Sequence, residues 1–130
     1  MWRVGNLRIN GGGMDIVVTN NPLVIAQYEG KYCVDYIETD LLGILTTVRD
    51  LIHKGHRLLT HPLMGSVKPN ESPYKSVVIS STTEGADVQS VTIIGESILA
   101  AKKFPPKEIP EQYLNDLQIV DLSLIRSALK

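Results

Sequence analysis

Cysteine is almost absent from this chain of 130 residues, in which Cys33 is the only thiol. An internal disulfide is therefore excluded, because it would need a second cysteine. Cys33 lies in an apolar stretch with no neighbouring base, so we interpret it as a buried strand thiol and not as a catalytic thiolate. With no disulfide and no signal peptide in the sequence, we expect a reducing, cytoplasmic location.

An excess of charge of either sign is also lacking, as are long apolar runs. The net charge is −1 at pH 7, so we expect no general attraction to nucleic acid or to an anionic membrane. No apolar run approaches the roughly 20 residues that a membrane-spanning helix needs. Hydrophobic residues make up 43% and charged residues 21% of the chain, which is typical of a globular protein.

Catalytic and metal-binding motifs are missing too. The glycines at 11–13 precede the first expected strand, whereas a dinucleotide fingerprint follows one, and there is no Walker-type loop. The spacing of His53, His56 and His61 matches no metal site. Ser66 with His61 would suggest a nucleophile and its base, but the motif Gly-x-Ser-x-Gly is absent. We therefore predict no metal, no cofactor and no hydrolase active site.

The domain organisation follows from a change of composition near the start. Residues 1–10 form a short mixed segment, and three glycines follow it directly. Such a run of glycine is a flexible link. We predict a flexible N-terminal leader over residues 1–13 and a single α/β domain over residues 14–130.

Short apolar, largely β-branched runs predict strands at residues 15–19, 32–37, 57–60 and 76–80. Helix starts lie between them, because Asn21 with Pro22 is a typical beginning and Asp40 and Asp87 are typical N-caps. Asp121 is interpreted as the cap of a last helix. The predicted helices span residues 22–28, 41–54, 88–104, 110–117 and 122–129.

This order of elements predicts the fold class. Strands that alternate with helices favour a parallel sheet covered on both faces. Right-handed crossovers then give a small Rossmann-like three-layer α/β/α sandwich with about four mostly parallel strands. The link between the strands at 57–60 and 76–80 holds no predicted helix, which leaves the direction of the fourth strand open.

The segment from His61 to Lys75 interrupts the pattern, because it holds three prolines among turn-forming residues. It follows the third expected strand, as the loop 19–22 follows the first. Ligands of open α/β sheets bind at the carboxyl ends of the strands. The two loops therefore face each other across a cleft if the first and third strands are neighbours.

Both loops are rich in groups that bind polar ligands. Lys68 and Lys75 are cationic donors, backbone amides near Gly65 can approach an anion, and His61 can donate, accept or act as a base. The predicted ligand is a small anion or an acidic segment of a partner. Its predicted binding residues are Asn20, Asn21, His61, Gly65, Ser66, Lys68, Asn70, Tyr74 and Lys75. The alternative is a loop that satisfies its own backbone and acts only as a rigid connection.

Three stretches carry a family resemblance: VVTNNPLV at 17–24, HKGHRLLTHPL at 53–63 and GSVKPNESPYKS at 65–76. Together they resemble the GrdX family, small proteins associated with the glycine, sarcosine and betaine reductase systems of anaerobic bacteria that ferment amino acids. The resemblance runs from Met14 to the C-terminus. It implies components of a glycine/betaine reductase complex as partners, and it brings no defined catalytic residues.

The functional hypotheses are three. An accessory binding protein fits best, because the chain has no selenocysteine and only one cysteine for redox chemistry. The alternative is an enzyme that uses His61 as acid or base and Lys68 as an anion anchor. A homodimer through apolar residues of the C-terminal helices is the third, with ordinary core packing as its competing explanation.

Overall fold

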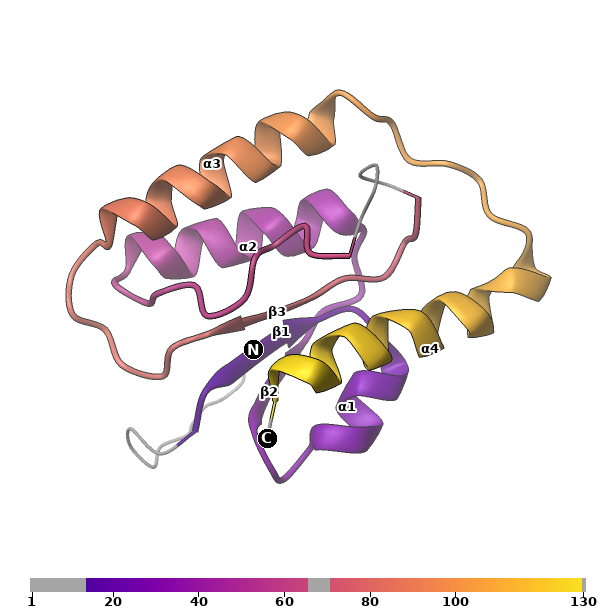
Figure 1. Cartoon of the computed structure of the whole chain (residues 1–130), viewed down its shortest axis with the longest axis horizontal. Helices are drawn as coiled ribbons and strands as arrows, with labels where there is room; N and C mark the ends of the chain where they lie inside the picture. Colours follow the sequence, from indigo (N-terminus) through magenta and orange to yellow (C-terminus); the bar gives the residue numbers. More distant parts are fainter. Residues whose placement is uncertain (1–13, 66–70, 130) are drawn as a thin grey trace.

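A three-stranded mixed sheet lies at the centre of the computed structural model, which describes residues 14–65 and 71–129 (Figure 1). The leader predicted at residues 1–13 lies outside the described residues. Strands and helices follow one another as β1 (Ile16–Thr19), α1 (Pro22–Tyr28), β2 (Cys33–Tyr36), α2 (Leu41–His53), β3 (Ser76–Ile79), α3 (Val88–Lys102) and α4 (Glu111–Ala128).

The sheet is mixed because β3 runs against its neighbour. In the order β2-β1-β3, Val17 of β1 lies opposite Val34 of the parallel β2 and opposite Val78 of the antiparallel β3. The α/β class is confirmed, but a Rossmann-like sheet of four mostly parallel strands is not found in the described residues. A parallel neighbour needs a long crossover, usually a helix. The described part of the link from α2 to β3 contains no helix, and β3 returns antiparallel.

The segment 57–60, predicted as a strand, makes only one bridge, between Leu58 and Ile79 of β3. Its backbone still follows β3, since Leu59 N donates to Val78 O at 2.9 Å. Thr60 N also donates to Val78 O at 3.3 Å, and Ser80 N donates to Arg57 O at 2.8 Å. Two side chains accept from further backbone amides. The amide of Leu58 donates to Ser90 Oγ at 3.0 Å, and the amide of Val78 donates to Thr60 Oγ1 at 3.0 Å. The segment is therefore an irregular edge of the sheet.

Helices cover both faces of the sheet, α2 and α3 on one and α1 and α4 on the other (Figure 1). Side chains of a strand alternate between the faces, so Val18 packs under α2 and α3 while Val17 packs under α1 and α4. The α1–α4 side holds the smaller of the two clusters of buried side chains, which are Val17, Val24, Tyr28, Val78 and Ile125.

Three helix starts are confirmed with their caps. Asn21 Oδ1 accepts from the amide of Leu23, Asp40 Oδ1 from that of Gly43, and Asp87 Oδ2 from that of Ser90. In each case a side-chain oxygen satisfies an amide that the first helical turn leaves without a partner. These contacts are local, which is why the sequence alone predicts them.

The two C-terminal helices predicted at 110–117 and 122–129 are one continuous helix, α4. The sequence between them contains no glycine or proline that would end a helix. Asp121 is not a cap, because its carboxylate accepts hydrogen bonds from Asn21 and Ser76 instead. The prediction of a break at Asp121 is therefore wrong.

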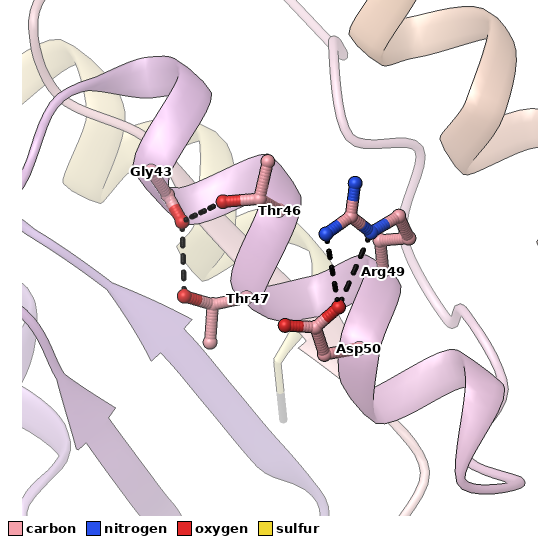
Figure 2. Close-up of polar contacts among 5 residues, drawn as sticks. All are labelled: Gly43, Thr46, Thr47, Arg49 and Asp50. Atoms are coloured by element: carbon pink, nitrogen blue, oxygen red, sulfur yellow. Dashed lines mark hydrogen bonds and ion pairs between the residues drawn. The ribbon is translucent and has the colours of Figure 1, made fainter.

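Helix α2 shows how one helix divides its polar and apolar residues. Figure 2 shows Thr46 Oγ1 and Thr47 Oγ1 donating to the carbonyl oxygen of Gly43, at 3.1 and 2.9 Å, and Arg49 paired with Asp50 on the exposed side. The other side of the helix is apolar and fully covered. Its buried residues are Leu41, Ile44, Leu45, Val48 and Ile52.

We predict that Leu45→Ala lowers the free energy of unfolding by about 2–5 kcal/mol, because it opens a cavity in this core. Leu45, on the apolar side of α2, is 0% exposed, whereas Leu99 on α3 is 63% exposed. Urea unfolding would measure the loss, with Leu99→Ala as a control that changes stability by less than about 0.5 kcal/mol. Equal losses in the two variants would contradict the packing of α2 on the sheet.

Candidate functional site

A cluster of buried polar side chains lies at the carboxyl end of β1, where α/β proteins commonly bind ligands. We call Thr19, Asn20, Asn21, Ser76 and Asp121 the β1-end cluster. Asp121 Oδ2 accepts from Ser76 Oγ at 2.8 Å and from Asn21 Nδ2 at 3.0 Å. The hydroxyls of Thr19 and Ser76 are 2.7 Å apart. The cluster therefore joins β1, β3 and α4 by side-chain hydrogen bonds.

Asn20 joins the long loop to the sheet. Its Nδ2 donates to the carbonyl oxygens of Thr39 and Pro73, at 2.7 and 2.8 Å, and its Oδ1 accepts from the amide of Lys75 at 2.8 Å. Asn20 is 6% and Asn21 0% exposed. Both predicted ligand-binding asparagines thus have their amides engaged by protein groups, which fits the alternative of a loop that is held rigidly.

Lys75 is the buried cation beside this cluster. Its side chain is 6% exposed, and Nζ donates to the carbonyl oxygen of Met64 at 3.3 Å. Burial lowers the pKa of Lys75 below its ordinary value, because desolvation disfavours the charged form, and the negative charge of Asp121 partly opposes the shift. An amine in such surroundings interacts more strongly with a nearby charge than one in water does.

A hollow of about 290 Å³ opens above Lys75, between the long loop and α4. We call it the α4 pocket. Tyr74 borders it, with its hydroxyl accepting from Gln118 Nε2 at 2.8 Å. Gly65 borders it too, at a φ of +76°, where an added Cβ would lie 2.5 Å from a methyl of Leu124. The lining residues are Gly65, Glu71, Ser72, Tyr74, Lys75, Leu117, Val120, Asp121 and Leu124.

His61 lies in a different hollow. Its exposed ring accepts from the amide of Leu63 at Nδ1, at 3.1 Å, and borders a cleft of about 370 Å³ against α3. We call this the α3 cleft. It is lined by Arg57, Leu58, Leu59, Thr60, His61, Asp87, Gln89, Ser90 and Ile93.

The structure thus places the described residues of the predicted site in two separate hollows. Gly65, Tyr74 and Lys75 line the α4 pocket, and Asn21 lies behind it on Asp121. His61 lines the α3 cleft, because β3 separates β1 from the segment that leads to His61. The other predicted residues, Ser66, Lys68 and Asn70, lie outside the described residues, so the hypothesis of catalysis by His61 with Lys68 stays a prediction.

Sequence reasoning missed Asp121 and Arg57 as site residues. Asp121 stands between Leu117 and Leu124 on a mostly apolar helix face, and a carboxylate in such a place signals a buried polar contact. Arg57 has no comparable signal. Its place opposite α3 depends on the irregular edge of the sheet, which pattern alone does not predict.

Residues 14–65 and 71–129 present neither a metal-binding cluster nor a membrane-spanning helix. This part of the chain contains no group of three or more His, Cys, Asp or Glu side chains placed to hold a metal ion. None of its helices combines the length and apolar character needed to cross a membrane.

The fold and its hollows define a small mixed α/β protein with two ligand-sized clefts on opposite faces of one sheet. The chain matches the model of the GrdX-like protein family over residues 16–130, and it belongs to that family. The resemblance carried by the asparagine and long-loop stretches is thereby confirmed. Searches of the curated proteins and of the solved structures gave no significant match.

We predict that Asp121→Ala lowers the free energy of unfolding by about 3–5 kcal/mol, because it removes the acceptor of two buried donors, on Asn21 and Ser76, and the negative charge that acts on Lys75. Asp116→Ala on the same helix is the matched control, since Asp116 is exposed, and it should change stability by less than about 0.5 kcal/mol. Urea unfolding of both variants measures the difference. Similar small losses would show that the β1-end cluster does not hold α4.

Because burial lowers the pKa of Lys75, the stability of the protein should depend on pH. The unfolded chain carries Lys75 at its ordinary pKa of 10.5, whereas the folded pKa is lower. Between these two values the unfolded state binds more protons, so the contribution of Lys75 to the free energy of unfolding rises with pH. Relative to Lys75→Met, which cannot titrate, the wild-type protein should gain stability as the pH rises toward 10.5.

Urea unfolding at several pH values from 7 to 10.5 would test this. Tyr36 acts in the opposite direction, because burial, followed by the charges of Glu38 and Tyr74, raises its pKa. Its effect is present in both proteins and cancels in their difference. A difference that stays constant with pH would contradict the lowered pKa of Lys75.

Proposed function

We propose that this protein is an accessory binding protein without catalytic activity of its own, and that its α4 pocket holds a small anionic ligand. Family membership implies association with glycine reductase systems. We place the protein in the cytoplasm, in glycine and betaine reductive metabolism, with components of the reductase complex as partners. The observation that carries the proposal is that Lys75, which is 6% exposed, lines a hollow of about 290 Å³.

The electrostatics of the α4 pocket support an anion. Nζ of Lys75 donates to Met64 O at 3.3 Å, and this contact holds the ammonium group in position. Because the site is poorly solvated, a carboxylate or phosphate beside Nζ gains more from the charge than it would on the surface. The ligand would also restore the charged form of an amine whose pKa burial has lowered.

The two carboxylates of the α4 pocket are already engaged. Asp121 accepts from Ser76 and Asn21. Glu71 forms an ion pair with Lys107, with 2.5 Å between Oε2 and Nζ. The charge of Lys107 offsets that of Glu71, and the hydrogen bonds from Ser76 and Asn21 hold the carboxylate of Asp121 in place.

The other wall of the pocket is apolar. Leu117, Val120 and Leu124 lie along one side of α4 and border the hollow. Small-molecule sites commonly combine such a wall with a few polar groups that fix orientation. The pocket is therefore suited to an organic anion whose hydrocarbon part contacts α4 while its charged end faces Lys75.

An accessory role also agrees with the chemistry that the chain lacks. Reductive cleavage of glycine or betaine requires redox groups, and Cys33 is the only thiol in the sequence. One thiol cannot cycle between a dithiol and an internal disulfide. We therefore assign the redox steps to the partners and a binding step to this protein.

Calorimetric titration with acetate, glycine, betaine and phosphate would test the proposal. We expect at least one of these to bind, and Lys75→Met to weaken that binding by about tenfold or more, the equivalent of about 1.4 kcal/mol. Lys31→Met is the matched control, because Lys31 is exposed in the turn before β2 and should not change affinity. Failure of all four compounds to bind the wild-type protein, or equal affinity in Lys75→Met, would overturn the proposal.

A further inference from the structure

The α3 cleft is a second candidate binding site, lined by residues other than those of the α4 pocket. With a volume of about 370 Å³, it falls in the range of small-molecule sites. One wall is the irregular sheet edge, residues 57–61. Along this edge, exposed residues alternate with the half-buried Leu58 and Thr60. The exposed residues of this edge are Arg57, Leu59 and His61, and all three line the cleft.

Arg57 provides a cationic end. Among the described residues its guanidinium makes no hydrogen bond or ion pair, although its charge acts on Asp87. The pKa of Asp87 is lowered mainly by hydrogen bonds from Ser90 and least by Arg57. Because the Asp87 carboxylate accepts from both the amide and the hydroxyl of Ser90, at 2.9 and 2.7 Å, it is committed to the first turn of α3. The planar donors of Arg57 suit a carboxylate.

His61 provides a neutral donor at the other end. Its Nδ1 accepts from the amide of Leu63 at 3.1 Å, so the neutral ring assigned from this contact carries its proton on Nε2. Four residues separate His61 from Arg57, and the chain bends at Leu59 and Thr60, so the two Cα atoms lie closer together than the roughly 13 Å of an extended chain. Between them the cleft is bordered by Leu59 and, from α3, by Ile93.

We propose that the α3 cleft binds an elongated organic dianion, with one carboxylate on Arg57, the other on His61 Nε2–H, and the hydrocarbon chain on Leu59 and Ile93. A short monocarboxylate reaches only one end and binds more weakly. This site is separate from the α4 pocket, which has its own cation, Lys75, beneath α4.

Titration of the ¹⁵N-labelled protein with adipate, succinate, acetate and phosphate, followed by amide chemical shifts, tests the proposal. At the amides that border the α3 cleft, we expect adipate to bind at least tenfold more tightly than acetate or phosphate. The shifted amides should belong to residues 57–61 and 87–93. Shifts confined to other residues, or equal affinities for adipate and acetate, would overturn it.

Variants separate this site from the α4 pocket. Arg57→Gln should weaken adipate binding about tenfold, because it removes the charge but keeps hydrogen-bond donors, and His61→Ala should weaken it a few-fold. Arg126→Gln on the exposed side of α4 is the matched control and should bind adipate as the wild type does. Lys75→Met should leave the adipate titration of the amides of residues 57–61 and 87–93 unchanged, whatever its effect in the α4 pocket. Unchanged affinity in Arg57→Gln, or loss in Lys75→Met, would contradict a separate site.

Discussion

The carboxylate of Asp121 is the contact on which the arrangement of α4 depends. It is 6% exposed and accepts from Ser76 of β3 and from Asn21 at the end of β1. A buried charge without partners is costly, whereas one that is hydrogen-bonded from two elements specifies how they pack. Because Asp121 can be satisfied in this way only when α4 lies across β1 and β3, it fixes the wall of the α4 pocket.

The antiparallel direction of β3 explains why the protein has two hollows and not one cleft. Thr19 at the end of β1 lies opposite Ser76 at the start of β3, so the loop before β3 returns to the carboxyl end of β1. Lys75 and Tyr74 arrive there, beneath α4. The sheet edge before the loop lies on the far side of β3, and His61 is left beside α3. One reversal of strand direction therefore separates a cation from an imidazole that the sequence places only fourteen residues apart.

The sequence predicts the local parts of the fold well and the pairing of strands poorly. The caps by Asn21, Asp40 and Asp87 act on amides two or three residues ahead, and the apolar face of α2 repeats within one helix. The segment 57–60 has the composition of a strand, but the side chains of Thr60 and Ser90 accept from two amides that a regular ladder would pair with backbone carbonyls. No pattern within 57–60 reveals that a serine on α3 will do so.

By itself, the sequence determined the α/β class, the helix starts, the family and the set of polar residues near the candidate site. Tertiary structure decided which of these residues are exposed and which hold the fold. The reason is the range of the contacts: Ser76 and Asn21 reach Asp121 across 45 and 100 residues of chain, and Asn20 binds Lys75 across 55. Caps and periodicity act within one or two turns, whereas a buried polar group finds its partner only when the layers have packed. The same asparagines that resemble ligand contacts in the sequence therefore join the strands and α4 in the folded protein.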